Sequence, residues 1–244
     1  TRCGVAVVNT PGRNAPAVAE LALGLMLCLA RRIPAAHQVV RSGAWEDPTM
    51  PYRSLRGSEL GGKTLGIVGL GAIGRELAQR GAALGMKVVA HDPYLSQSKA
   101  QTLGTHLIGL EELLQEADFV SLHCPTTDAT RGLIDSGRLA LMKSSSYLVN
   151  TADAALVDEA ALADSLREGR LAGAGLDVFP SHPVAPDNPL LGLDNVVLTP
   201  HIGGATEETI ARHSHMMVDD ILRFLHGERP LHLVNPEMWS ERGK

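Results

Sequence analysis

The stretch KTLGIVGLGAIGRELAQRGAALGMKVVAHDPY, residues 63–94, decides the fold of this chain. Residues 64–68 form an apolar run of the length of a buried strand, and three glycines follow at once in the spacing G-x-G-x-x-G. From Ala72 the apolar residues recur with a helical period, and a second apolar run at 86–90 ends just before Asp92. A strand, a glycine triplet, a helix, a strand and a carboxylate in this order are typical of a dinucleotide-binding unit.

Each glycine of the triplet has a predicted task. Gly69 permits a tight turn off the strand, Gly71 leaves room for a pyrophosphate, and Gly74 lets the helix pack close to the strand. Asp92 follows Gly69 by 23 residues and is placed to accept hydrogen bonds from the ribose hydroxyls of adenosine. Because a carboxylate repels a 2′-phosphate, the sequence favours NAD(H) over NADP(H). The alternative is a glycine-rich turn in some other α/β domain.

Composition places the chain among soluble globular proteins and excludes several classes of partner. With 244 residues, of which 44% are hydrophobic and 20% charged, it can form one large or two modest domains. A net charge of −5 without a basic block makes nucleic acid and membranes poor partners. Three widely spaced cysteines, Cys3, Cys28 and Cys124, favour a reducing, cytoplasmic location. The longest apolar stretch, 21–30, is too short to span a bilayer, and we expect no signal peptide.

Strands and helices alternate along the chain, which predicts a doubly wound parallel sheet with helices on both faces, a Rossmann-type α/β fold. Further strands are expected at 106–108, 118–123, 146–150, 172–177 and 196–199. Further helices are expected near 96–103, 110–115, 135–141, 158–167 and 206–226. Ahead of the glycine motif we expect a strand at 5–8, a helix ending near 33, and an irregular surface connection at 41–62.

The helix expected at 15–33 is apolar on nearly every face. Such a helix is buried either in the core of its own domain or in an oligomer interface. Since a single domain rarely surrounds a helix completely, we expect a homodimer in which this helix packs against the neighbouring subunit.

Eight segments carry a family resemblance. They are NTPGRNAPAVAE (9–20), TLGIVGLGAIG (64–74), HDPY (91–94), HCPTTDATRGLI (123–134), LMKSSSYLVNTA (141–152), GLDVF (175–179), LTPHIGGAT (198–206) and VNPE (234–237). With them the chain resembles the D-isomer-specific 2-hydroxyacid dehydrogenases, which include phosphoglycerate dehydrogenase, glyoxylate/hydroxypyruvate reductases and formate dehydrogenase. These motifs do not specify the member of the family, and we favour a phosphoglycerate-dehydrogenase-like branch. The resemblance implies an NAD-dependent oxidoreductase that transfers hydride between NAD(H) and a small-molecule 2-hydroxy or 2-keto acid.

The resemblance also implies roles for single residues. His201 corresponds to the general acid/base, which gives a proton to the carbonyl oxygen as hydride arrives. Ala72 and Ile73 would lie against the pyrophosphate, and Thr151 and Asp177 beside the nicotinamide. The whole implied cofactor-binding set consists of Gly69, Gly71, Ala72, Ile73, Gly74, Asp92, Cys124, Thr126, Thr151, Ala152, Asp177, Gly203 and Gly204.

Two catalytic positions depart from the family pattern. After the strand at 146–150 the family has N-x-x-R-G, whose arginine grips the substrate carboxylate, whereas this chain has Asp153. Before Pro183 the family has a glutamate that holds the catalytic histidine, whereas this chain has His182, and neighbouring imidazoles disfavour protonation of both rings. We therefore expect Asp153, His182 and His201 to form an impaired catalytic site.

Two other functions remain open. One is an NAD-binding protein without catalysis, such as a sensor or an assembly partner. The other, less favoured, lets Asp153, His182 and His201 hold a divalent metal that replaces the arginine, although no resident metal is expected.

The resemblance further implies a second domain. Family members carry about a hundred more residues of a substrate-binding domain ahead of the segment with which this chain starts. We accordingly expect 13–205 to form the dinucleotide-binding domain, and 1–12 with 206–244 to be remnants of the substrate-binding domain.

Overall fold

The structure, a computed structural model, describes residues 5–241 and divides into two compact units. The larger unit comprises Val18–Gly203. The smaller unit comprises the described residues up to 17 together with those from 204 onward. That the smaller unit derives from a substrate-binding domain stays a prediction. Within the described residues, no helix has the length and apolar character that crossing a membrane requires.

The larger unit is built on a seven-stranded sheet in which every pair of neighbouring strands is parallel. Its strands are β1 (Thr64–Val68), β2 (Lys87–His91), β3 (His106–Leu107), β4 (Phe119–Leu122), β5 (Tyr147–Asn150), β6 (Gly173–Leu176) and β7 (Val196–Leu198). They lie in the order β3-β2-β1-β4-β5-β6-β7. The prediction of a doubly wound parallel sheet is therefore confirmed.

The strand order reverses beside β1, which lies between β2 and β4. Val68 at the end of β1 is level with His91 of β2 and with Leu122 of β4. The loops that leave these three strands consequently start at the same edge of the sheet. Open parallel sheets bind their ligands in the crevice at such a reversal.

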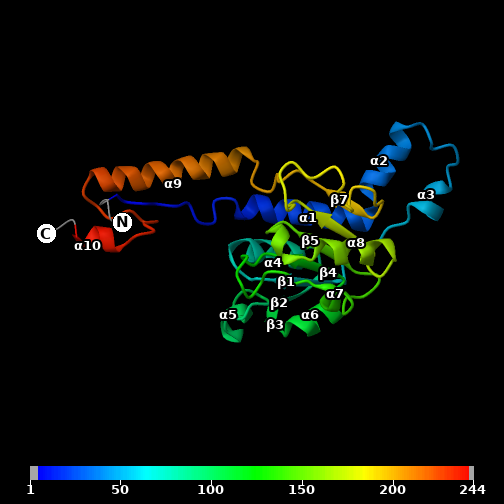
Figure 1. The fold of residues 1–244 in the computed structure, drawn as a ribbon, viewed down its shortest axis with the longest axis horizontal. Helices are drawn as coiled ribbons and strands as arrows, with labels where there is room; N and C mark the ends of the chain where they lie inside the picture. The colour runs from blue at the N-terminus through cyan, green and yellow to red at the C-terminus, as the bar shows by residue number, and fades with distance from the viewer. Residues whose placement is uncertain (1–4, 242–244) are drawn as a thin grey trace. The chain divides into compact units, whose positions relative to one another are not determined.

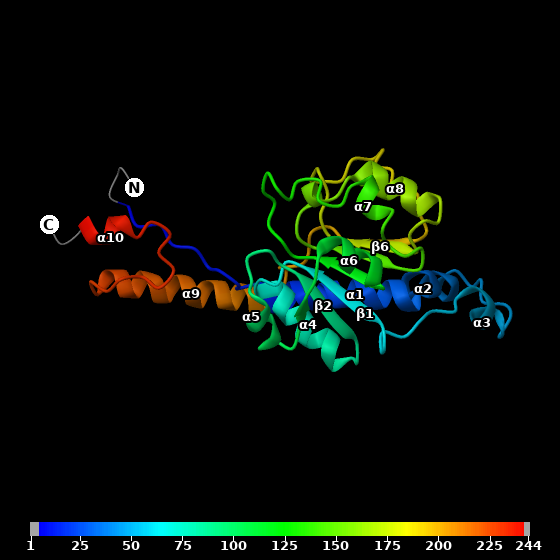
Figure 2. The same ribbon diagram turned by 90° about the horizontal axis from the view of Figure 1, so that it is seen from below.

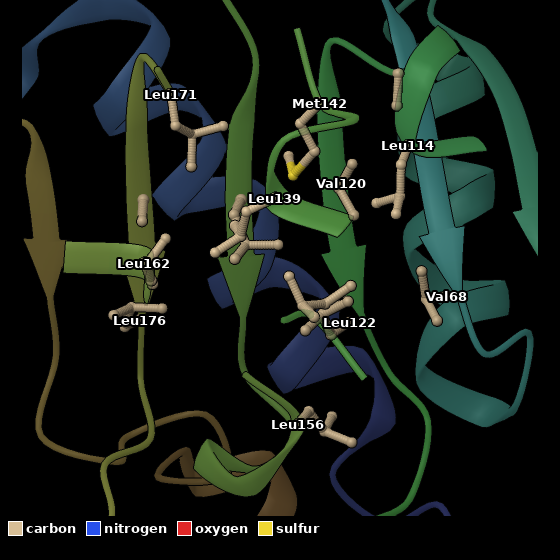
Figure 3. Close-up of a cluster of buried hydrophobic side chains, with 14 of the residues drawn as sticks. Val68, Leu114, Val120, Leu122, Leu139, Met142, Leu156, Leu162, Leu171 and Leu176 are labelled. Atoms are coloured by element: carbon tan, nitrogen blue, oxygen red, sulfur yellow. The ribbon is translucent and has the colours of Figure 1, made fainter. Parts of the chain in front are cut away.

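Helices cover both faces of the sheet, as Figures 1 and 2 show. Strand residues alternate between the faces, so that Ile67 packs with α1 (Ala15–Arg31) and α4 (Ala72–Ala83), while Val68 points to the other side. That side is covered by α6 (Leu110–Glu116), α7 (Ser136–Leu139) and α8 (Glu159–Arg167), and Figure 3 shows its leucine-rich core. Each fully buried leucine there stabilises the fold by about 1.5–3 kcal/mol. A short helix, α5 (Gln97–Gln101), precedes β3.

Helix α1 ends earlier than the sequence predicts. It stops at Arg31, and Arg32 takes the left-handed conformation with φ of 53°. A new helix, α2 (Ile33–Arg41), then starts with a proline in its first turn, where the missing N–H costs nothing. The segment predicted to be irregular also contains a short helix, α3 (Met50–Ser54).

Helix α1 packs one of its faces into the core of the larger unit. Leu25 is 2% exposed, and Met26 and Ala22 are fully buried. A Cβ added to Gly175 of β6 would lie 2.9 Å from Cβ of Leu25. The core interpretation therefore holds for this face, while Leu23 and Leu27 remain partly exposed.

In the smaller unit, the extended residues 5–10 run beside α9 (Glu207–Leu225) and beside the residues that follow this helix (Figure 1). The predicted strand at 5–8 is wrong, because only Val8 forms an isolated antiparallel bridge, with Leu233. Two backbone hydrogen bonds accompany this bridge, from N–H of Asn9 to the carbonyl of His232 and from N–H of Val234 to the carbonyl of Val7. The side chain of Asn235 extends the pairing by donating to the carbonyl of Val5 and accepting from N–H of Val7. The last helix is α10 (Glu237–Glu241).

The chain after α9 is tied back to the helix by Asp220, a carboxylate that is 2% exposed. It accepts hydrogen bonds from the backbone N–H of Leu231 and from the backbone and ring of His232. Burial alone would raise the pKa of Asp220, but these donors hold it below its usual value.

Candidate functional site

The glycine loop after β1 has backbone geometry that side chains would obstruct. Gly69 has φ of +93°, and a Cβ there would lie 2.6 Å from the backbone nitrogen of Cys124. A Cβ on Gly74 would lie 2.2 Å from the carbonyl oxygen of Gly69. A Cβ on Gly71, by contrast, would meet no atom of the described chain within 4 Å. The loop is therefore closed on its inner side and open at Gly71, which faces free space.

Asp92 clamps the glycine loop to the end of β2. Its Oδ2 accepts a hydrogen bond of 2.9 Å from N–H of Leu70, and its Oδ1 accepts one of 3.0 Å from N–H of Tyr94. Each carboxylate oxygen can accept a further donor. The side chain of Arg75 holds the same loop by donating from Nε to the carbonyl of Leu70 at 3.0 Å.

The end of β4 contributes two groups with perturbed protonation. Nε2 of His123 lies 2.8 Å from Oγ of Ser121, while its Nδ1 is buried with no partner in the described chain. Burial lowers the pKa of His123 to about 4, so the ring stays neutral. Burial and, secondarily, the charge of Asp92 raise the pKa of Cys124, which keeps its thiol protonated.

Two hydroxyl groups at this edge of the sheet lack a partner. Oγ1 of Thr126, after β4, and Oγ1 of Thr151, after β5, are buried without a hydrogen bond among residues 5–241. Buried polar atoms without partners are rare in folded proteins and call for a water molecule or a ligand. Together with the open space over Gly71 and the spare acceptors of Asp92, they fit a dinucleotide, which offers hydroxyls, phosphates and an amide.

A buried carboxylate shapes the turn that carries His201. Asp177, only 1% exposed, follows β6. Its Oδ1 accepts from Oγ1 of Thr199 at 2.6 Å and from N–H of Ile202 at 2.8 Å, and its Oδ2 accepts from N–H of Gly203 at 2.8 Å. The resemblance implied that Asp177 contacts the nicotinamide. In the structure, both of its oxygens are engaged by the turn at 199–203.

His201 sits in this turn with a left-handed backbone, φ of 56°. Residues other than glycine rarely adopt this conformation, and such strain persists only where the surroundings impose it. The three donors bound by Asp177 supply that constraint. Nδ1 of His201 lies 3.1 Å from Nε2 of His182, so the two exposed rings form a hydrogen-bonded pair in which one nitrogen donates and the other accepts.

Asp153 has a local structural task. Its Oδ1 accepts from N–H of Ala155 at 2.8 Å and caps the short 3₁₀ helix η1 (Ala154–Leu156). Its carbonyl accepts from Nδ2 of Asn150, the last residue of β5. The side chain is exposed and forms no ion pair with a cation of the described chain.

The metal alternative is wrong for the part of the chain that the structure describes. No group of three or more His, Cys, Asp or Glu side chains within 5–241 is arranged to hold a metal ion. Asp153, His182 and His201 therefore do not converge as ligands.

The predicted site residues follow the strands of the sheet. The glycine loop, Asp92 and Cys124 lie at the ends of β1, β2 and β4, whereas Thr151, Asp177 and His201 follow β5, β6 and β7. Because carboxyl ends of parallel strands share one edge, these groups lie at one edge of the sheet in the larger unit. Gly203 packs against Asp177 there, while Gly204 belongs to the smaller unit and packs against Asn14. Sequence reasoning did not identify the unpaired Nδ1 of His123, because no sequence pattern shows whether a buried ring nitrogen has a hydrogen-bond partner.

Comparison with known proteins agrees with this geometry. Residues 23–203 match the model of the family described as "D-isomer specific 2-hydroxyacid dehydrogenase, NAD binding domain". The chain is 42% identical over 242 residues to a glyoxylate reductase of Korarchaeum cryptofilum, covering 99% of this chain and 73% of that protein. It is 42% identical over 235 residues to a D-3-phosphoglycerate dehydrogenase of Archaeoglobus fulgidus, covering 96% of this chain and 44% of the relative.

A solved structure shows the same fold. The D-lactate dehydrogenase of Aquifex aeolicus, crystallised with NAD and lactic acid, superimposes with a TM-score of 0.80 at 31% identity. The match covers 93% of this chain and 71% of that one.

Proposed function

Since the chain belongs to the D-isomer specific 2-hydroxyacid dehydrogenase family and carries its NAD-binding domain, we propose that it binds NAD(H) in the crevice at the carboxyl edge of the sheet and acts as a slow NAD-dependent oxidoreductase on 2-hydroxy or 2-keto acids. The observation that carries this proposal is the turn at 199–203 after β7, in which the buried carboxylate of Asp177 holds His201 in a strained conformation.

The residues of the crevice suit each part of the cofactor. The N–H groups at the start of α4 and the open space over Gly71 would hold the pyrophosphate. The carboxylate of Asp92 would accept hydrogen bonds from the adenosine ribose. The unpaired hydroxyls of Thr126 and Thr151 would bind polar groups nearer the nicotinamide. Bound NAD(H) supplies the acceptor or donor of the hydride.

His201 would supply the proton chemistry. Its Nε2 is not engaged by His182, which contacts Nδ1, so Nε2 is the atom that would give a proton to the carbonyl oxygen or take one from the alcohol. His182 orients the ring through this hydrogen bond. An anionic partner would stabilise the protonated ring, and His182 does so less well. We infer a reaction slowed at the proton-transfer step.

Asp153 would slow the reaction further. A keto acid that approached this carboxylate to about 4 Å would be repelled by roughly 4 kcal/mol at an effective dielectric of 20. The site would also lack a guanidinium to polarise the carbonyl, and a lost electrostatic group of this kind costs about 10²–10³-fold in rate. We expect fewer than about one turnover per minute, well below the usual enzyme range.

The test combines binding with a single turnover. NADH should bind with saturable fluorescence, and its oxidation should be followed with hydroxypyruvate, glyoxylate and phosphohydroxypyruvate. The double variant Asp153→Arg with His182→Glu should raise the rate by about 10²-fold or more, and each single change should help little because the groups act together. Because relatives are longer than this chain, the comparison is best made in a protein extended to their full length.

The other candidate is an NAD-binding protein without catalysis. The observation that favours it is the capping role of Asp153, which gives this carboxylate a structural use unrelated to a substrate. Saturable NADH binding with no oxidation in the unmodified chain and none in the double variant would establish this alternative. Absence of NADH binding would refute both.

We also propose that the chain forms a homodimer. The support comes from α2 and α3. Neither helix contains a buried residue, although α2 carries Val40, 61% exposed, and α3 carries Tyr52, 74% exposed. Exposed apolar side chains concentrated on one segment mark an interaction surface. Leu25 is unsuitable for testing the interface, because it lies in the core of its own unit.

A further inference from the structure

Two basic side chains of the smaller unit contact one hydroxyl group, and a third binds the backbone beside it. Oγ1 of Thr10, a residue only 7% exposed, lies 3.0 Å from an Nη of Arg13 and 3.1 Å from Nδ1 of His213 on α9. Arg212 joins them by donating from Nε to the carbonyl of Arg13 at 2.7 Å. Arg13, Arg212 and His213 are called the basic cluster below. Two segments that are about 200 residues apart in the chain form it, and they meet at the buried Thr10.

The chemistry of the guanidinium fixes the direction of one of these hydrogen bonds. A guanidinium can only donate, so Oγ1 of Thr10 accepts from Arg13. The hydroxyl keeps its own proton and a second lone pair, so it either donates to Nδ1 of His213 or accepts from it, according to the tautomer of the ring. With the imidazole proton on Nε2, the groups of the cluster left for a ligand are all donors: Nε2–H of His213 and the guanidinium N–H groups that Thr10, Thr209 and the backbone do not engage.

No carboxylate of the smaller unit, as far as the structure describes it, pairs with the basic cluster. Glu208 precedes Arg212 by four residues on α9, a spacing that commonly forms a surface ion pair. Arg212 instead turns its guanidinium to the carbonyl of Arg13 and, at 3.5 Å, to Oγ1 of Thr209. Arginines elsewhere in the same unit follow the usual pattern, as Arg223 pairs with Glu228 at 3.3 Å.

We propose that the basic cluster is a binding site for a small oxyanion, either a phosphate monoester or a carboxylate. Two guanidinium groups and an imidazole N–H offer several donors to one anion, and forked guanidinium donors match the spacing of two oxygens in either group. An anion there would also offset the positive charge of Arg13 and Arg212, neither of which pairs with a carboxylate of the described residues. The proposal concerns the smaller unit alone and does not depend on NAD binding or on hydride transfer.

The test uses the whole chain, with inorganic phosphate and acetate as probes and sodium chloride at matched ionic strength as the reference. Proton NMR of the histidine rings should show a saturable shift of the His213 signals with a Kd on the order of 1–10 mM. The ring signals of His106, which lies in the other unit, should not move. A stronger response to phosphate than to acetate would identify the phosphate monoester as the ligand class, and the reverse order the carboxylate.

Variants separate the site from general charge effects. The pair Arg13→Gln with Arg212→Gln should weaken binding at least tenfold. Arg229→Gln removes an exposed arginine of the same unit and should leave the affinity unchanged. Arg13→Lys keeps the charge but loses the fork, and an intermediate affinity is expected. No saturable shift at His213 in the unmodified chain, or equal losses in the Arg229→Gln control, would overturn the proposal.

Discussion

Replacing Asp177 with asparagine should unfold the turn that carries His201 and destabilise the larger unit. The carboxylate is 1% exposed and accepts three hydrogen bonds, from Oγ1 of Thr199 and from the N–H groups of Ile202 and Gly203. An asparagine oxygen can keep the two donors that Oδ1 receives. Its NH₂ group then faces N–H of Gly203, so that two donors confront each other.

The expected loss follows from these contacts. A hydrogen bond to a charged group contributes about 1.5–3 kcal/mol, and the buried N–H of Gly203 left without an acceptor costs about 1–3 kcal/mol. The two remaining bonds lose their charge assistance, which roughly halves them. We expect Asp177→Asn to lower the free energy of unfolding by about 3–6 kcal/mol. In a chain of this size, each kcal/mol lowers Tm by about 2–4 °C.

Urea unfolding followed by circular dichroism measures the effect. Asp187→Asn is the matched control, because Asp187 is exposed and makes no side-chain hydrogen bond within the described chain, and it should change stability by less than about 0.5 kcal/mol. Thr199→Val removes one of the three bonds and should cost about 1–2 kcal/mol. A loss below about 1 kcal/mol for Asp177→Asn, accompanied by lost NADH affinity, would refute the turn-holding role and restore Asp177 as a direct cofactor contact.

Three further predictions concern protonation, the cofactor and assembly. The pKa of His123 falls from 6.5 to about 4 on folding. Because the unfolded chain then binds the proton more readily, the free energy of unfolding should be highest above pH 6.5 and should fall by up to about 3 kcal/mol as the pH decreases towards 4. His123→Asn should remove this step from a pH series of urea unfolding. NADH should bind at least tenfold tighter than NADPH in fluorescence titrations, Asp92→Ser should abolish the preference, and Gly71→Val should abolish binding of both; equal affinities in the unmodified chain would contradict the role of Asp92. Sedimentation at micromolar concentration should show a dimer that Val40→Asp with Tyr52→Asp dissociates, whereas a monomeric unmodified chain would reject the interface.

The sheet could be predicted because the apolar pattern of each strand is visible in the residues of that strand alone. β1 is found within its predicted bounds, since the run at 64–68 is apolar throughout and the glycine after it must turn. The end of α4 was also predictable, because Gly85 takes φ of +77°, which few other residues adopt. Patterns of this kind depend on neighbours in the chain and need no knowledge of distant contacts.

The features that could not be predicted from the sequence depend on contacts with distant residues or on sequence patterns that fit two structures equally well. A proline in the first turn of a helix looks the same as one that ends a helix, so the start of α2 at Ile33 was read as the end of α1. Val8 resembles a strand residue, but its bridge partner Leu233 lies at the other end of the chain. The three donors of Asp177 lie 22–26 residues away, and the only signal for them is a buried-strand carboxylate followed by a Thr-x-His turn.

Asp153 and His182, the two positions at which the sequence departs from the family pattern, differ from Gly69, Gly74 and Asp177 in how the fold constrains them. Gly69 and Gly74 cannot accept a side chain without moving backbone atoms, and Asp177 is buried with three donors, so changes there would cost stability. Asp153 and His182 are exposed. Removing the carboxylate of Asp153 would cost only a helix cap, about 1 kcal/mol. The scaffold therefore tolerates an acid or a base at 153 and 182, and the chemistry of the bound molecule, rather than folding, determines which side chain serves there.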